Sequence, residues 1–133
     1  MTTIAPGYEA LPIYRVASGL VISIERIVRE FSRYHKYQFG ARLRQTALEV
    51  LLLVGRAYRR GADRGPVLVE LCEHVEELKL LVNVGKEVEA FASFKQYAQV
   101  MEQVVSLARQ AEGWRKATQR LRPTLPSGGR EPL

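Results

Sequence analysis

Hydrophobic side chains recur every three or four residues through four long segments of the chain. The first segment shows this spacing most regularly, at Ile13, Ala17, Leu20, Ile24, Ile27 and Phe31. Residues three and four apart lie on one side of an α-helix, so this spacing predicts an amphipathic helix over about residues 12–33. Pro12 suits the first turn of that helix, because a backbone N–H is not needed there.

The same periodicity predicts three further helices, over about residues 41–60, 66–90 and 94–120. Ser93 and Gln96 form a capping-box pattern in front of the last one. Gly85 lies within the third predicted helix, where it either lets a neighbouring backbone approach or weakens the helix by about 1 kcal/mol, and we expect close packing. No segment alternates apolar and polar residues as a half-buried strand does.

These elements predict an all-α fold, specifically an antiparallel up-down-up-down four-helix bundle over residues 11–121. A chain of 133 residues suits one domain of this kind. Residues 1–10 show no periodicity and are expected to form a flexible N-terminal tail. Residues 122–133 are rich in proline and glycine and are expected to form a disordered C-terminal tail.

The second predicted helix is apolar on nearly every side. Beyond a main stripe that includes Leu43, Val50 and Val54, it carries further leucines at Leu48, Leu51 and Leu52. A helix with this pattern is buried on more than one side, and a four-helix bundle covers only one. We therefore expect Leu48, Leu51 and Leu52 to form the interface of a homo-oligomer.

The chain carries a net charge of +6, and its charges are unevenly distributed. Residues 26–64 are strongly basic, residues 70–89 are mainly acidic, and residues 109–122 are basic again. If these segments are neighbouring helices, one side of the molecule is basic and favours polyanions. The alternative is that the basic residues only solvate helix faces, and charge alone does not separate the two.

The segment between the first two predicted helices mixes aromatic and basic residues. We expect Tyr34, Tyr37 and Phe39 to pack against the helix ends, and the cations nearby to hold phosphate. Contacts to phosphate rather than to bases are expected, because no base-reading motif is present. The candidate nucleic-acid-binding residues are Arg26, Arg29, Arg33, Lys36, Arg42, Arg44, Arg56, Arg59 and Arg60.

Neither a catalytic site, a metal site nor a cofactor is expected from the sequence. It contains no phosphate-cradling glycine loop and no nucleophile elbow. Glu70, His74 and Glu77 could share a helix face, but the paired Glu-x-x-His motifs of di-iron bundles are missing. The single Cys72 fits a small core residue and a reducing compartment. With no apolar run of about 18 residues, we expect a soluble, cytoplasmic protein that does not contact membranes.

Several short motifs give the chain a resemblance to a known family. In chain order they are Tyr14, the segment Phe31 to Gly40, Leu43-Arg44, Ala57 to Arg59, Leu78 to Leu81, Lys95 to Tyr97 and Gly113-Trp114. Over about residues 11–120 the chain resembles the Avd-like (accessory variability determinant) four-helix proteins of diversity-generating retroelements. It more loosely resembles the four-helix proteins encoded in intervening sequences of bacterial 23S ribosomal RNA genes.

The Avd-like resemblance implies a non-catalytic, basic homopentamer. Such a protein binds the reverse transcriptase of its element, together with RNA or DNA, and supports mutagenic retrohoming. Two alternatives stay open at this point: a stand-alone RNA-binding bundle like the ribosomal-RNA-gene relatives, and a purely structural oligomerisation module. A reverse transcriptase gene beside this one would separate the first two interpretations.

Overall fold

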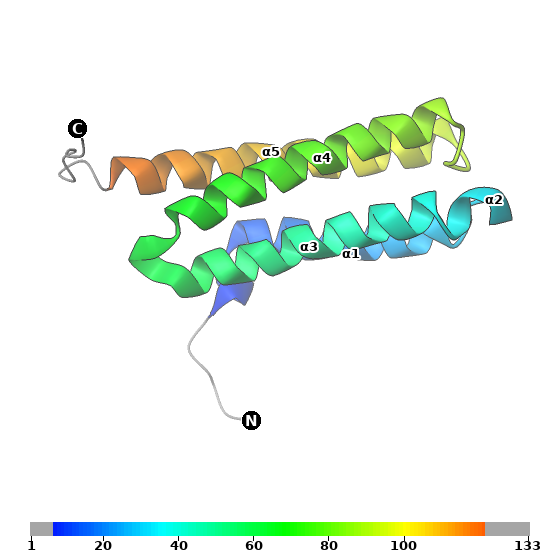
Figure 1. The fold of residues 1–133 in the computed structure, drawn as a ribbon. Helices are drawn as coiled ribbons and strands as arrows, with labels where there is room; N and C mark the ends of the chain where they lie inside the picture. Colours follow the sequence, from blue (N-terminus) through cyan, green and yellow to red (C-terminus); the bar gives the residue numbers. More distant parts are fainter. Residues whose placement is uncertain (1–6, 122–133) are drawn as a thin grey trace, which may run out of the picture.

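The computed structural model describes residues 7–121. Within them four long helices are present and no strand: α1 (Pro12–Val28), α3 (Phe39–Arg60), α4 (Gly65–Glu87) and α5 (Phe94–Arg120). The prediction of an all-α four-helix bundle is therefore confirmed (Figure 1). The expected C-terminal tail and residues 1–6 of the expected N-terminal tail lie outside the described residues.

The long helices lie side by side in two layers, α1 with α3 and α4 with α5 (Figure 1). Each helix packs on the one before it, and α5 closes the square by packing on α1. The colours in Figure 1 run along α1, back along α3, out again along α4 and back along α5. The interior is filled by fully buried aliphatic side chains from all four helices, including Leu20, Leu43, Leu78 and Leu107. None of the described helices combines the length and apolarity needed to cross a membrane.

The first helix ends at Val28, earlier than the expected residue 33. After it the chain turns, with the Phe31 N–H donating to the Val28 carbonyl at 3.0 Å. A single helical turn follows as α2 (Arg33–Lys36). This early end turns Phe31 inward, where it is 4% exposed and meets the edge of Phe91 at a ring-centroid distance of 5.6 Å.

The aromatic cluster at this end explains why α4 carries a glycine in its last turns. A Cβ placed on Gly85 would lie 2.7 Å from Cε2 of Phe91 and 3.0 Å from Cε2 of Phe39. Both distances are shorter than a normal contact, so only glycine lets α4 pass this close to the two rings. The expectation of close packing at Gly85 is confirmed.

Two short 3-10 turns complete the other end of the bundle. Residues Tyr8–Ala10 form η1, so part of the expected flexible tail is ordered, and Tyr8 packs on Tyr14 with ring centroids 5.0 Å apart. Residues Gly61–Asp63 form η2 between α3 and α4. Arg64 ties this turn to the body, because its Nε donates to the Ala57 carbonyl at 2.9 Å and its guanidinium lies 5.4 Å from the centre of the Trp114 ring.

Candidate nucleic-acid interface

The nine basic residues singled out by the sequence all reach the surface. Eight are exposed or half-exposed along the long helices and their ends, and Lys36 is partly buried in α2. They do not all lie on the one basic side that the charge distribution predicted. They separate into acid-paired arginines along α3, cations at the end of α1 and in α2, and cations at the end of α3.

The acid-paired arginines are Arg42, Arg44 and Arg56. Arg42 pairs with Glu77 of α4, and Arg56 Nη1 lies 3.8 Å from Glu70 Oε1 of the same helix. These two side chains therefore reach toward α4, away from α1. Each of these arginines has a carboxylate that competes with phosphate for its guanidinium, although the pairs are exposed and each contributes only about 1 kcal/mol or less.

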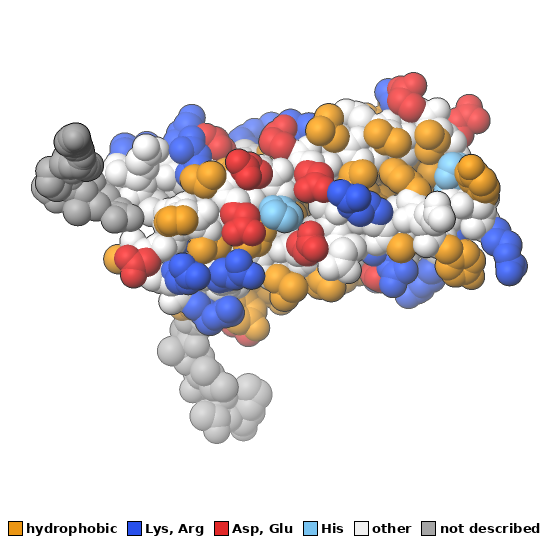
Figure 2. Space-filling model, viewed as in Figure 1, with side chains coloured by type: hydrophobic (Ala, Val, Ile, Leu, Met, Phe, Trp, Pro, Cys, Tyr) orange, Lys and Arg blue, Asp and Glu red, His pale blue; other side chains and the backbone are white. Residues whose placement is uncertain are grey.

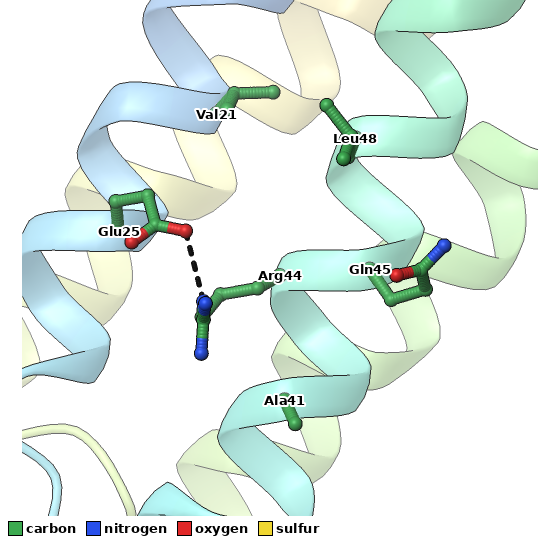
Figure 3. A pocket seen from close by; sticks show the side chains of 6 residues that line it. All are labelled: Val21, Glu25, Ala41, Arg44, Gln45 and Leu48. Carbon is green, nitrogen blue, oxygen red and sulfur yellow. Dashed lines mark hydrogen bonds and ion pairs between the residues drawn. The ribbon is translucent and has the colours of Figure 1, made fainter.

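Arg44 lies on the opposite flank of α3, in the groove beside α1. Its Nε donates to Glu25 Oε2 at 2.8 Å, and the pair bridges the groove (Figure 3). The groove has a volume of about 230 Å³, and Val21 and Leu48 extend toward each other across it (Figure 3). Arg44 is thus an element of the α1–α3 contact as well as a surface cation.

Arg26 lies on a third side of the molecule. It follows Gly19 by seven residues, so the two share a face of α1. A Cβ on Gly19 would lie 3.9 Å from Gln103 Nε2 of α5, which places that face toward α5. Arg26 therefore does not share a side of the molecule with Arg42 and Arg56, because α1 and α3 turn their basic flanks in different directions.

The second group surrounds α2. Arg29 caps the end of α1, and Arg33 and Lys36 begin and end α2. The nearby acid Glu30 accepts a hydrogen bond from Gln96 Nε2 at 2.9 Å. No ion pair within 4.0 Å involves Arg29, Arg33 or Lys36 among residues 7–121. Their charges are therefore free to act on a ligand.

Two of the three aromatic side chains expected to pack in this segment are exposed instead. Tyr34 is 86% exposed and Tyr37 is 68% exposed, whereas Phe39 is partly buried against the core. The buried place that we assigned to the tyrosines is taken by Phe31 and Phe91. The expectation of buried Tyr34 and Tyr37 rings is therefore wrong, because α2 turns both rings outward.

The third group lies where α3 ends. Lys and Arg side chains gather over this end of the molecule (Figure 2). Arg56 and Arg59 border a hollow of about 390 Å³ with Tyr8 and Tyr14. Arg59 and Arg60 have no acidic partner within 4.0 Å in the described part of the chain. Tyr8 could not be placed beside these cations from the sequence, because residues 1–10 were expected to form a tail, and Tyr14 was noted only as part of the family resemblance.

The leucines expected at an oligomer interface differ in exposure. Leu48 is 41% exposed and Leu52 is 59% exposed, whereas Leu51 packs partly against the core. The sequence analysis missed a second exposed apolar row on α4, formed by Leu80, Val84 and Val88. Its signal was a four-residue spacing that lies off the core stripe of that helix.

Cys72 and His74 of α4 each have a hydrogen-bond partner within the bundle. Cys72 Sγ donates to Glu112 Oε1 at 3.5 Å, and burial together with this carboxylate raises the pKa of the thiol to about 11. Arg115 donates to the same carboxylate and lowers the pKa of Glu112. His74 Nδ1 lies 3.0 Å from the Glu70 carbonyl oxygen. In the described part of the chain, no three His, Cys, Asp or Glu side chains converge as metal ligands would.

The chain was compared with models of protein families and with curated proteins. No family model and no curated protein matches it.

Proposed function

We propose that this protein is a non-catalytic accessory protein that binds nucleic acid and the reverse transcriptase of a retroelement, in support of mutagenic retrohoming. The observation that carries the nucleic-acid part is the set of exposed cations without acidic partners in the described residues. Arg29 and Arg33 lie at one end of the bundle, and Arg59 and Arg60 lie at the other. The polymerase partner and the retrohoming role are supported by the Avd-like resemblance described above.

The physical basis of binding is phosphate neutralisation. An arginine already paired with a carboxylate must give up that partner to hold a phosphate, whereas an unpaired one only exchanges water and counterions. Arg26, Arg29 and Arg33 are of the second kind in the described residues, and Arg42, Arg44 and Arg56 are of the first. Binding through them should tolerate sequence and fall steeply as salt increases.

Two triple variants with the same change in net charge test this distinction. The first is Arg26→Gln, Arg29→Gln and Arg33→Gln, and its matched control is Arg42→Gln, Arg44→Gln and Arg56→Gln. We expect the first to weaken RNA binding about ten-fold or more near 0.1 M salt, and to reduce the slope of log affinity against log salt by about two. The control should have a much smaller effect. Affinity is measured at several salt concentrations, beside a thermal melt of each variant.

Equal losses in the two variants would mean that net charge, not unpaired arginines, governs binding. Absence of any binding by the wild-type protein would leave the purely structural oligomerisation module as the function.

The partner is tested by co-purification with the reverse transcriptase encoded beside this gene, with and without nuclease. A complex that survives nuclease supports the accessory role through direct contact. Absence of such a gene, with RNA binding intact, would favour the stand-alone RNA-binding bundle related to the 23S ribosomal-RNA-gene proteins.

We also propose that the protein works as a homo-oligomer, expected to be a pentamer from the resemblance. The exposed Leu48 and Leu52 support this, because α3 carries more apolar surface than one bundle buries. Repeating the same cations in several subunits would strengthen weak phosphate contacts through avidity.

A further inference from the structure

Two tyrosine rings project from the end of the bundle next to unpaired cations. Tyr34 and Tyr37 are the most exposed aromatic rings in their segment, and they flank Lys36 along α2 and its C-cap. A large aromatic ring left in water forgoes the stabilisation that burial gives. Two such rings close together on an ordered segment therefore offer apolar area that a ligand can cover.

Buried side chains and backbone hydrogen bonds fix the position of the segment that carries these rings. Phe31 is buried and lies 6.2 Å, centre to centre, from the stacked ring of Phe39. The N–H groups of His35 and Lys36 donate to the Ser32 carbonyl at 3.0 and 2.9 Å. A Cβ on Gly40 would lie 2.7 Å from Val28 Cγ1, so α3 is packed tightly against the end of α1. Rings presented on such a base lose little conformational entropy when a ligand binds.

The chemistry around the rings suits a nucleobase. A hollow of about 370 Å³ is lined by Tyr34, His35, Gln38 and Phe39. Tyr34 forms one wall, with its ring edge-to-face to His35 at 5.0 Å between centroids. The exposed Gln38 amide offers both a hydrogen-bond donor and an acceptor for a base edge. Arg33 and Lys36 lie within four residues of both tyrosines, where they can reach a backbone phosphate.

We propose that Tyr34 and Tyr37 stack on unpaired bases of single-stranded nucleic acid, while Arg33 and Lys36 hold the adjacent phosphates. This inference rests on the proposed nucleic-acid binding and adds its substrate class. A duplex is excluded from this mode because its bases already stack on one another, so that their faces are not available. We favour a single strand over a protein partner, because Arg33 and Lys36 beside the rings have no ion-pair partner within 4.0 Å in the described residues and can neutralise a backbone phosphate.

The test compares a 5′-labelled single-stranded RNA decamer with a blunt duplex RNA of the same length. The variant Tyr34→Ala/Tyr37→Ala removes both rings, and the matched control Tyr34→Phe/Tyr37→Phe retains them. Because each base–ring stack contributes about 1–3 kcal/mol, we expect loss of both rings to weaken single-strand binding about 30-fold or more. The phenylalanine variant should bind within about two-fold of wild type, because the stacking faces remain. Duplex affinity should not change.

The salt dependence gives a second readout that a loss of charge could not imitate. The alanine variant removes no phosphate contact, so its slope of log affinity against log salt should equal that of wild type. Thermal melts should coincide, because both rings are exposed in the folded protein.

The outcomes that would overturn the inference differ from the one that would overturn the proposed function. Unchanged single-strand affinity in the alanine variant, or an equal loss for the duplex, would remove the stacking role and leave the proposed phosphate binding intact. A change of oligomeric mass in the alanine variant without a loss of RNA affinity would assign the rings to a protein contact. Failure of wild type to bind either RNA would instead overturn the proposed function itself.

Discussion

Gly85 marks the tightest contact between α4 and the aromatic end of the bundle. Its missing side chain makes room for Phe91 and Phe39, whose ring atoms lie 2.7 and 3.0 Å from where a Cβ would be. We expect Gly85→Ala to lower the free energy of unfolding by about 1–2 kcal/mol. Overpacking of about 1–3 kcal/mol outweighs the gain of up to about 1 kcal/mol in helix propensity. Urea denaturation measures the change.

Gly113 provides the matched control within α5. A Cβ there would meet nothing within 4 Å, so Gly113→Ala adds helix propensity without a clash. We expect it to raise the free energy of unfolding by about 0.5–1 kcal/mol. If both substitutions stabilise, the rings at Gly85 can move aside and the close packing described above is wrong.

Cys72 gives a prediction that depends on pH. Burial and the Glu112 carboxylate raise the pKa of its thiol from 9.0 to about 11 in the folded chain. A raised thiol pKa stabilises the folded state below pH 9, and that contribution is lost as the pH rises through about 11. At pH 9 the folded protein should therefore hold roughly fifty-fold less thiolate than the unfolded chain, and iodoacetamide should label it correspondingly slowly.

The variant Glu112→Gln tests whether the Glu112 charge or restricted access of the reagent slows the labelling of Cys72. Removing the carboxylate charge should lower the pKa of Cys72 and speed labelling at pH 9, since Arg115 then remains as the nearby charge. An unchanged rate would mean that restricted access, rather than the carboxylate, protects the thiol.

At the scale of elements, α4 ends in a Schellman motif built on a residue that is poorly suited to it. The Ala90 N–H donates to the Gly85 carbonyl at 2.9 Å, and the Glu89 N–H donates to the Lys86 carbonyl at 3.1 Å. Glu89 has a φ of 59°, in the left-handed region where glycine is favoured. We expect Glu89→Gly to raise the free energy of unfolding by about 0.5–1 kcal/mol, because the strain of about 1 kcal/mol is relieved.

Gly61→Ala is the converse experiment at the end of α3. Gly61 has a φ of 57° with open space where its Cβ would be, so only backbone strain changes. Its ψ of −122° lies outside the left-handed helical region, so the alanine variant should lose about 1–3 kcal/mol of stability, as measured by urea denaturation. If Glu89→Gly and Gly61→Ala change the free energy of unfolding in the same direction, backbone conformation is not the cause of the changes.

The ends of helices could be predicted where neighbouring residues determine them. They could not be predicted where contacts between residues distant along the chain determine them. The capping box was local, and the Gln96 N–H does donate to Ser93 Oγ at 3.1 Å. The end of α1 was not, because Phe31 fits the helical spacing yet leaves the helix to meet Phe91, which is distant along the chain. Tyr34 lies in the short helix α2 that follows, and its exposed ring could not be predicted from the periodicity.

Prediction of the candidate site from the sequence also failed where contacts between helices decide the outcome. The sequence identified which arginines would reach the surface, because they lie off the apolar stripes. It could not show that Arg42 and Arg56 meet Glu77 and Glu70, since that depends on how α3 and α4 align. Charge counted along the chain therefore overstated the basic surface on α3.

At the scale of the whole molecule, rows of exposed apolar residues lie on two different helices. Leu48 and Leu52 lie on α3, and Leu80 lies on α4 with 66% of its surface exposed. Large exposed side chains gathered on one helix favour contact with another chain. The sequence predicts the oligomer contact on α3. Leu80 on α4 is a leucine of similar exposure, so it can serve as a control for the α3 leucines.

We therefore expect the double variant Leu48→Glu/Leu52→Glu to dissociate the oligomer and Leu80→Glu to leave it intact. Both introduce carboxylates at exposed positions, so the bundle should stay folded, and the new carboxylate at position 52 would lie one turn before Arg56 in a favourable arrangement. Light scattering after size exclusion measures the mass, which for a wild-type pentamer is about five times the chain mass of 15.1 kDa. A wild-type monomer at micromolar concentration would contradict assembly altogether. Dissociation by Leu80→Glu alone would instead place the contact on α4, where the apolar row of Leu80, Val84 and Val88 would then carry the assembly.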